Sequence, residues 1–319
     1  MYAGESHQQL TMLSFGGGQD SSAIAEMYLR DIDGFRAQYA PGRLIAVMSD
    51  TGDEFPQTYK HVTETMERFK AAGVPFFFLT KDMGYHSAAW PSLIEYYRAK
   101  NAVGSKAYPK TCTDNLKIRP IYKFLDHWIA QEFGLAQGRE GRGKLAIKEF
   151  ARRFGKINVL IGIARGEERR VKGGKNTPGK WYDESIQPVY PLIELGMDRK
   201  DCQDLLHQYG LHVLPSNCIR CPFLDLVELE YLRRFHPVEL AEWVEIEATK
   251  LEANRHMENV ETITPKTGKV KVVNKNYGVF VSKYLPEMIV TARANYADWT
   301  DERISTHRYS HGHCVATAY

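Results

Sequence analysis

A glycine-rich segment near the amino terminus has the residue types of a phosphate-binding loop. Residues 14–22 follow a short apolar run and precede a stretch with helical spacing, so the segment is predicted to join a strand to a helix. Glycines let the backbone approach phosphate oxygens, and the N–H groups at the start of a helix bind anions. Ser21 and Ser22 can add hydroxyl donors, whereas the carboxylate of Asp20 would repel phosphate unless it caps the helix or binds Mg²⁺. The alternative is an ordinary tight turn.

Cysteines are the second group of reactive side chains. The chain has five, an odd number without a secretory signal, which favours thiols, a metal site or catalysis over a disulfide framework. Cys218 and Cys221 form a Cys-x-x-Cys, whose spacing lets two thiolates share one metal or cluster or form a redox pair. Cys202 falls in an apolar helical stretch and is interpreted as a buried structural thiol. Cys314 lies near the carboxyl terminus beside two histidines.

The glycine-rich loop is not of the Walker type, because no Gly-Lys-Ser/Thr follows at the required spacing. Its sequence over 14–21, Ser-Phe-Gly-Gly-Gly-Gln-Asp-Ser, resembles the Ser-Gly-Gly-x-Asp-Ser loop of the PP-loop ATP pyrophosphatases. It resembles more closely the Ser-Phe-Ser-Gly-Gly-Lys-Asp-Ser loop of the phosphoadenosine phosphosulfate (PAPS) reductase superfamily. Gly16 stands where that superfamily usually has serine, which removes a hydroxyl donor. Gln19 stands where it often has lysine, which removes a positive charge.

Four further segments resemble the same superfamily in the same order. They are Ser-Asp-Thr-Gly-Asp-Glu-Phe-Pro-Gln-Thr over 49–58, Lys-Thr-Cys-Thr-Asp-Asn-Leu-Lys-Ile-Arg-Pro over 110–120, Gly-Ile-Ala-Arg-Gly-Glu-Glu-Arg-Arg over 162–170, and Gln-Pro-Val-Tyr-Pro-Leu over 187–192. The third match is looser, because one extra residue separates Gly162 from Arg165 and Arg169 stands where the family has serine. The resemblance carried by these five segments extends over roughly residues 10–223.

The resemblance implies an α/β fold, with a mostly parallel sheet flanked by helices as in the adenine nucleotide α-hydrolases, that binds ATP and Mg²⁺. Mg²⁺ would be held by Asp20, with Asp50 as a second candidate ligand. The catalytic candidates are Asp20, Cys112, Lys117 and Arg165, of which the two cations would contact the phosphates. The nucleotide-binding candidates are Ser14, Gly16, Gly17, Gly18, Gln19, Asp20, Ser21, Ser22, Asp50, Thr51 and Gly162.

The pattern of cysteines indicates which subgroup of the superfamily the sequence resembles. PAPS reductases end in a Glu-Cys-Gly-Leu/Ile-His segment that this sequence lacks, and the pattern looks like that of the DNA phosphorothioation proteins. That subgroup implies an ATP pyrophosphatase that adenylates a backbone phosphate. Sulfur would pass from a cysteine desulfurase through Cys112, Cys218 or Cys221, as a persulfide or on a [4Fe–4S] cluster that Cys202 could complete. Three alternatives stay open: tRNA thiolation, PAPS or adenylyl-sulfate reduction, and a non-catalytic nucleotide-binding regulator.

Apolar runs that alternate with amphipathic stretches predict the elements that position these residues. Strands are expected over 10–15, 44–48, 74–79 and 157–163, and helices over 21–29, 58–71, 116–131 and 201–209. A mobile surface loop is expected over 166–179. The α/β pattern fades near residue 223, so a PP-loop domain is expected over 1–223 and a mainly helical extension over 224–319. The extension is predicted to hold helices over 224–234, 239–256 and 288–295 and a hairpin over 262–273 that turns at 265–268.

The composition is that of a globular chain, with 43% apolar and 25% charged residues and a net charge of +3 over 319 residues. No apolar run is long enough to span a bilayer and no signal peptide is evident, so a cytoplasmic location without membrane association is expected. Basic residues cluster over 139–156 and 165–180. They form either a solvated face or a stripe that meets nucleic acid. The resemblance to the DNA phosphorothioation proteins implies DNA as the favoured partner, beside the desulfurase and other proteins of a modification complex.

Overall fold

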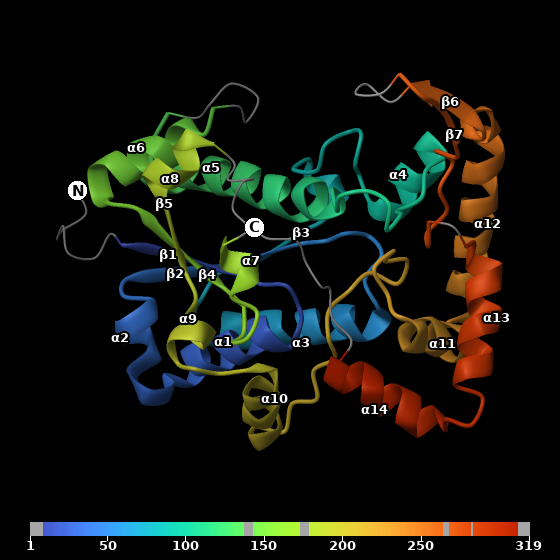
Figure 1. Cartoon of the computed structure of the whole chain (residues 1–319). Coiled ribbons are helices and arrows are strands. Elements are labelled where there is room, and N and C mark those ends of the chain that lie inside the picture. The colour runs from blue at the N-terminus through green and yellow to red at the C-terminus, as the bar shows by residue number, and fades with distance from the viewer. Residues whose placement is uncertain (1–8, 137–142, 173–178, 264–267, 282, 312–319) are drawn as a thin grey trace.

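A five-stranded, fully parallel sheet forms the centre of the computed structural model, which describes residues 9–136, 143–172, 179–263, 268–281 and 283–311 (Figure 1). The strands are β1 (Leu10–Ser14), β2 (Arg43–Ser49), β3 (Phe76–Leu79), β4 (Ile157–Ile161) and β5 (Ile186–Val189), in the spatial order β3-β2-β1-β4-β5. The order reverses at β1, which pairs with both β2 and β4. Sheets of this kind bind ligands outside the carboxyl ends of the strands at such a reversal.

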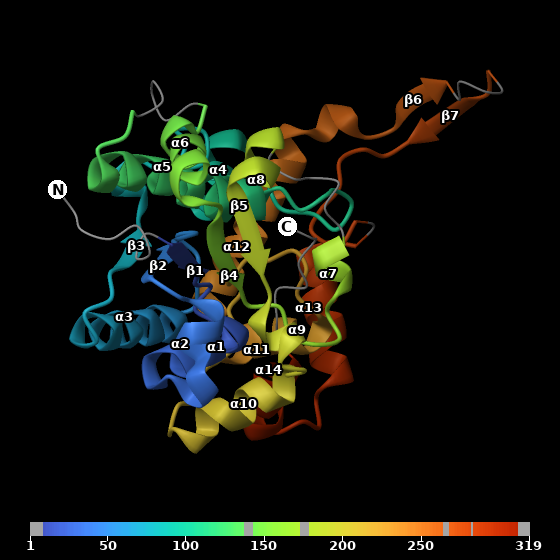
Figure 2. The ribbon, with the colours of Figure 1, turned by 90° about the vertical axis from the view of Figure 1, so that its left-hand side faces the viewer.

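Helices cover both faces of the sheet, because successive residues of a strand point to opposite faces. Met12 of β1 packs in a core with α5 (Arg119–Phe133) and α6 (Leu145–Phe154). Leu13 packs in a second core with α1 (Gln19–Arg30), α3 (Pro56–Ala71) and α10 (Arg199–Gln208). Both views show α5, α6 and α8 (Lys180–Ser185) on one side of the sheet and α1, α3 and α10 on the other (Figures 1 and 2). This Rossmann-like arrangement confirms the α/β class predicted from the sequence.

The first four strands agree with the predicted ones to within a few residues, but β5 is not among the predictions. Its segment contains Pro188, which has no N–H to donate to a ladder. The proline is tolerated because β5 lies at the edge of the sheet. Within the segment expected to be a loop, Arg169–Lys172 forms the short helix α7, and residues 173–178 lie outside the described ranges.

The remaining helices before residue 223 are short connections. They are the 3-10 turns η2 (Ile32–Gly34) and η3 (Lys81–Met83), the π-helical segment η4 (Thr113–Ile118), and the helices α2 (Phe35–Tyr39), α4 (Leu93–Lys100) and α9 (Pro191–Glu194). The sequence pattern predicts neither α4 nor α6. Each is short, and neither continues into a long amphipathic run.

The part after residue 223 is mainly helical, as predicted. It contains α11 (Leu226–Phe235), α12 (Pro237–Ala253), α13 (Leu285–Asn295) and α14 (Asp301–His311), the 3-10 turn η6 (Arg255–Met257), and a hairpin of β6 (Val260–Ile263) and β7 (Val270–Val273). The hairpin projects from the body of the molecule (Figure 2), and residues 265–267 of its expected turn lie outside the described ranges. Residues on both sides of position 223 share one core, in which Phe55 and Ile219 belong with Trp243 and Leu285.

Among the residues that the structure describes, no helix combines the length and the apolar character needed to cross a lipid bilayer.

Candidate nucleotide and thiol site

An open cleft lies at the carboxyl ends of β1, β2 and β4, at the point where the strand order reverses. Residues of the glycine-rich loop contribute polar lining: Ser14, Gly16, Gly18, Gln19, Asp20 and Ser21. A second group is mostly apolar: Met12, Met48, Ile118, Ile121, Tyr122, Val159 and Ile161. A few polar groups beside a larger apolar surface are typical of small-molecule sites, and here the two groups match the phosphates and the base of a nucleotide.

Two glycines let the backbone around the cleft pack closely. Gly17 has φ +70°, and a Cβ there would come within 3.0 Å of Thr58 Cγ2 on α3. Gly162, which follows β4, lies against the first turn of α1, where an added Cβ would be 2.8 Å from the nitrogen of Ser21. The first turn of a helix leaves its N–H groups without acceptors inside the helix. The start of α1 at this loop therefore favours an anion.

Arginines from two further segments stand beside the loop. Asp20, in the first turn of α1, is buried and accepts a 3.2 Å hydrogen bond from Nη2 of Arg199 at the start of α10. Arg199 also lies 3.0 Å from a carboxylate oxygen of Glu167, which pairs with Arg170 as well. Both arginines line the cleft. Arg199 lies outside the five segments that resemble the superfamily, so the sequence carries no signal for it.

Lys117 lies on the π-helical segment η4, which runs directly into α5. π-helical turns are rare and recur at functional sites. At the end of β2, the hydroxyl of Ser49 donates a 2.6 Å hydrogen bond to the carbonyl of Leu116, which holds the segment against the sheet. Lys117 Nζ is 3.1 Å from Oε1 of Glu54, whose side chain is fully buried. The expected phosphate cation therefore lies in the cleft wall, paired with a buried carboxylate.

A second, narrow cavity brings three cysteines together. Cys112 precedes η4, and Cys218 and Cys221 belong to the loop before α11, yet all three line this cavity. Its wall also contains Thr113 and Lys117, which line the nucleotide cleft too. Cys112, at the start of η4, thus lies across a shared wall from the cleft with the glycine-rich loop.

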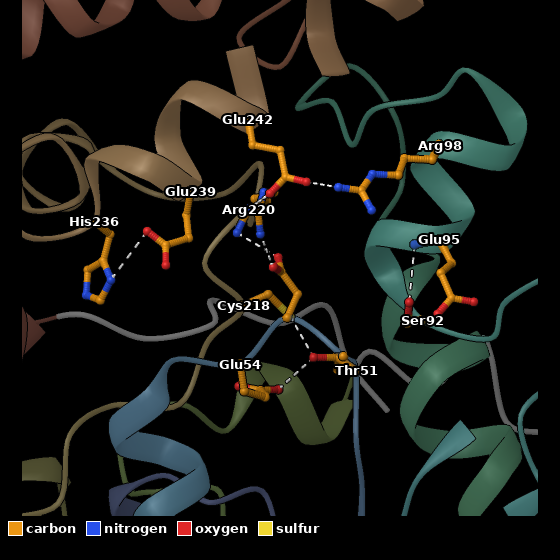
Figure 3. A network of polar contacts seen from close by, with 12 residues as sticks. Thr51, Glu54, Ser92, Glu95, Arg98, Cys218, Arg220, His236, Glu239 and Glu242 are labelled. Carbon is orange, nitrogen blue, oxygen red and sulfur yellow. Dashed lines mark hydrogen bonds and ion pairs between the residues drawn. The ribbon is translucent and has the colours of Figure 1, made fainter. Parts of the chain in front are cut away.

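The Cys-x-x-Cys loop is fastened to the sheet end by a polar network (Figure 3). Cys218 Sγ lies 3.4 Å from Oγ1 of Thr51, which in turn donates to Glu54 at 3.2 Å. Arg220, between the two cysteines, donates its backbone N–H to the carboxylate of Asp53 at 2.9 Å, and its guanidinium pairs with Asp53 and with Glu242 of α12. The network ties the thiol loop to the segment after β2 and to the C-terminal part of the chain.

The thiol cavity is unfavourable for negative charge. Burial raises the pKa of the Cys218 thiol well above its usual range, the Glu54 carboxylate raises it further, and the Lys117 ammonium opposes both. Burial also raises the pKa of Tyr97 well above its usual range, and the charges of Cys112, Cys218 and Cys221 raise it further. A thiolate here would need a cation, a metal or a proton acceptor brought by a partner.

Several residues that the sequence predicts for the nucleotide site make contacts outside the cleft instead. Arg165 is half-exposed and pairs with Asp198 at 3.1 Å. Asp50 accepts 2.8 Å hydrogen bonds from the N–H of Gly52 and the hydroxyl of Tyr59. The hydroxyl of Ser22 lies 2.7 Å from a histidine of α3. In the part of the chain that the structure describes, the side chains lining the cleft do not include Arg165, Asp50 or Ser22, and Gly17 does not line it either.

Two other candidates have roles that the sequence does not suggest. The amide of Gln19 donates to the carbonyls of Val213 at 3.0 Å and Tyr309 at 3.1 Å, which joins the phosphate loop to α14. Thr51 lines the cysteine cavity and contacts Cys218, and it is absent from the described lining of the nucleotide cleft.

Of the remaining cysteines, Cys202 is fully buried in the core of α1 and α3, as its interpretation as a structural thiol requires, and Cys314 lies outside the described residues. The described part of the chain contains no group of three or more His, Cys, Asp or Glu side chains arranged to hold a metal ion. Cys112, Cys218 and Cys221 line one cavity, but in this structure they are therefore not arranged as the thiolate ligands of an iron–sulfur cluster.

No protein-family model matches the chain, and no curated protein matches it.

Proposed function

We propose that this protein is an ATP pyrophosphatase of the PP-loop type that adenylates an acceptor for sulfur transfer to nucleic acid, with the backbone phosphate of DNA as the favoured acceptor. The observation that carries this proposal is the shared wall: Thr113 and Lys117 line both the cleft with the glycine-rich loop and the cavity with three cysteines. Sulfur transfer requires that an activated phosphorus and a sulfur atom meet, and adjoining cavities permit that meeting.

ATP binding is assigned to the first cleft. The first-turn N–H groups of α1 and the hydroxyls of Ser14 and Ser21 receive phosphate oxygens, and the apolar lining receives the adenine. Lys117, Arg170 and Arg199 supply positive charge. Mg²⁺, when bound, would neutralise charge on the departing phosphates, and Asp20 is the carboxylate in the cleft wall that fits it.

In the first step, an oxygen of the acceptor phosphate attacks the α-phosphorus of ATP. The bond from that phosphorus to the oxygen bridging to the β-phosphate breaks, and pyrophosphate leaves. The protein's contribution is electrostatic, because negative charge develops on pyrophosphate beside the N–H groups of α1 and the three cations. The acceptor phosphate is then joined to AMP.

In the second step, sulfur displaces AMP. The terminal sulfur of a cysteine persulfide, loaded by a cysteine desulfurase, attacks the acceptor phosphorus, and the bond to AMP breaks. A second cysteine then attacks the protein-bound sulfur of the resulting P–S–S–C linkage. This releases the phosphorothioate and leaves a disulfide, which a dithiol reductant returns to two thiols. Three thiols in one cavity supply both the carrier and the resolving cysteine.

The products of ATP turnover test the adenylating chemistry. Protein purified without oxygen is incubated with ATP, Mg²⁺ and single- or double-stranded DNA or tRNA, and nucleotides and pyrophosphate are separated. We expect AMP and pyrophosphate in equal amounts, and a loss of at least about a hundredfold in Asp20→Asn, because removing one preorganised charge in such a site has that size.

Asp82→Asn is the matched control, since Asp82 is exposed and lies outside the lining of the cleft. It should turn over ATP as the wild type does. Production of ADP, or no turnover with any of the acceptors, would contradict the proposed function. Tight ATP binding without turnover would instead favour a nucleotide-binding regulator.

A further inference from the structure

A third cavity adjoins the thiols on another side. It shares Leu93, Lys110, Cys112 and Pro222 with the cysteine cavity, whereas the nucleotide cleft shares Thr113 and Lys117 with that cavity. The three spaces therefore follow one another, with the cysteines in the middle. Neither ATP binding nor sulfur transfer from the cysteines, as described above, uses this third space.

Aromatic side chains dominate its wall. Trp90 and Tyr96 are stacked, with ring centroids 3.5 Å apart and planes at 10°. Tyr97 is buried at the inner end, while Tyr108 is 49% exposed at the outer end and Phe223 completes the set. The inner end is closely packed, because an added Cβ on Gly104 would come within 2.5 Å of the hydroxyl of Tyr97. An exposed tyrosine beside this packed aromatic wall offers a ring face for a further planar group.

The charge around this cavity favours an anion. Among its described lining residues, Lys110 is the charged side chain, and no carboxylate is present. The ammonium group of Lys110 lies 5.6 Å from the ring centroid of Phe223, and Lys106, four residues earlier, lies 4.5 Å from that of Phe280. Aromatic ring faces combined with lysines are how proteins hold single-stranded nucleic acid, by stacking the bases and neutralising the backbone.

We propose that this third cavity binds an unpaired nucleobase of the acceptor strand, stacked on its aromatic wall, with the adjacent backbone phosphate directed past Lys110 to Cys112. The inference rests on the proposed function and specifies the form of its substrate: a single-stranded or unwound nucleic acid. A base inside a duplex is stacked on both sides and cannot enter such a pocket without leaving the helix, which costs its pairing and stacking energy.

Stacking of the base is measured directly with a single-stranded DNA oligonucleotide that carries 2-aminopurine, whose fluorescence falls when it stacks on an aromatic ring. The full chain should quench the probe and bind it more tightly than it binds the same sequence as a duplex. Tyr108→Ala should weaken single-strand binding at least about fivefold and reduce the quenching, as expected for loss of one base–aromatic contact. Tyr108→Phe should retain both, because it keeps the ring.

Phe235→Ala is the matched control, since Phe235 is also a partly exposed aromatic residue but lies on α11 outside this cavity. Lys110→Gln should weaken binding and lower its salt dependence without abolishing the quenching. Equal binding and quenching by wild type and Tyr108→Ala, or a preference for the duplex, would overturn the inference. Melting temperatures of the variants show whether the fold is intact.

The experiments distinguish absence of the nucleobase site from absence of the proposed adenylating reaction. Quenching that depends on Tyr108, in a protein that makes no AMP from ATP, would leave the nucleobase site standing and refute the adenylating chemistry. AMP formation with DNA that is unchanged by Tyr108→Ala, together with unchanged quenching, would refute the site and leave the chemistry standing.

Discussion

At the scale of single residues, the glycine-rich loop differs from the PAPS reductase loop at Gly16 and Gln19, and these two residues have different surroundings in the structure. The space at Gly16 is open, since the nearest atom to an added Cβ is Ser21 Oγ at 3.8 Å. Gln19 is buried, and its amide is bonded to two backbone carbonyls. A lysine there would bring a charge into a site that a neutral amide already satisfies, at the cost of desolvation. The glutamine is thus explained by its neighbours, whereas nothing in the packing excludes serine at position 16.

We therefore predict opposite outcomes for two neighbouring glycines. Gly16→Ser should fold and bind ATP as well as the wild type or better, because it adds a hydroxyl donor in open space. Gly17→Ala should lower the free energy of unfolding by about 1–3 kcal/mol, because an L-residue is strained at φ +70° and its Cβ meets Thr58. It should also weaken ATP binding. Denaturant melts and titration with a fluorescent ATP analogue measure both effects, and equal behaviour of the two variants would contradict this reading of the loop.

At the scale of elements, the C-terminal helix α14 links the two ends of the site. Arg308 is buried, lies 4.0 Å from the ring centroid of Phe55, and donates a 3.0 Å hydrogen bond to Asn217, which precedes Cys218. The carbonyl of the next residue, Tyr309, accepts from Gln19 in the phosphate loop. One helix from the end of the chain thus contacts both the nucleotide loop and the thiol loop, which makes the C-terminal part integral to the site.

Removal of Arg308 should test this link. Arg308→Met should destabilise the chain by about 2–4 kcal/mol, through loss of a charge-assisted hydrogen bond and a desolvated cation–π contact. ATP affinity should fall as well, because α14 supports Gln19. Arg303→Met on the same helix is the control: Arg303 stacks on Trp299 at 3.9 Å but is exposed, so its loss should cost less than about 1 kcal/mol. Similar losses of stability in both variants would show that α14 docks by a different contact.

These elements show what local sequence patterns can and cannot reveal. The buried runs of β1 and β2 and the glycine turn carry their own signal, because a strand buried on both faces is apolar throughout. The local sequence signal is weak for the edge strand β5, which contains Pro188, and for the helix α14, which has few apolar residues. The pairing of Gln19 with Tyr309, 290 residues away, and the approach of Arg199 to Asp20 depend on the complete fold, so no local pattern predicts them.

At the scale of the whole molecule, several arginines of the two basic clusters, residues 139–156 and 165–180, form ion pairs with acidic side chains of the same chain. On α6, Arg152 and Arg153 both pair with Glu149, while the buried face of the helix joins the core. Arg165 and Arg170 pair with acidic residues near the nucleotide cleft. Part of each cluster, including Arg139 and Lys175, lies outside the described residues. We therefore propose that nucleic acid meets the aromatic cavity beside Lys110 rather than these stretches.

The central proposal is that the nucleotide cleft and the thiol cavity are two halves of one reaction, and tracing sulfur into DNA tests it most directly. The chain is incubated with ATP, Mg²⁺, single-stranded DNA, a dithiol, and a cysteine desulfurase with ³⁵S-cysteine, and the digested DNA is analysed for phosphorothioate linkages. Labelled phosphorothioate should form only with ATP. Cys218→Ala should abolish the label while AMP and pyrophosphate still appear, and Cys202→Ala, which alters only the buried core thiol, should retain it. Full labelling by Cys218→Ala and Cys112→Ala, or labelling without ATP, would contradict the proposal.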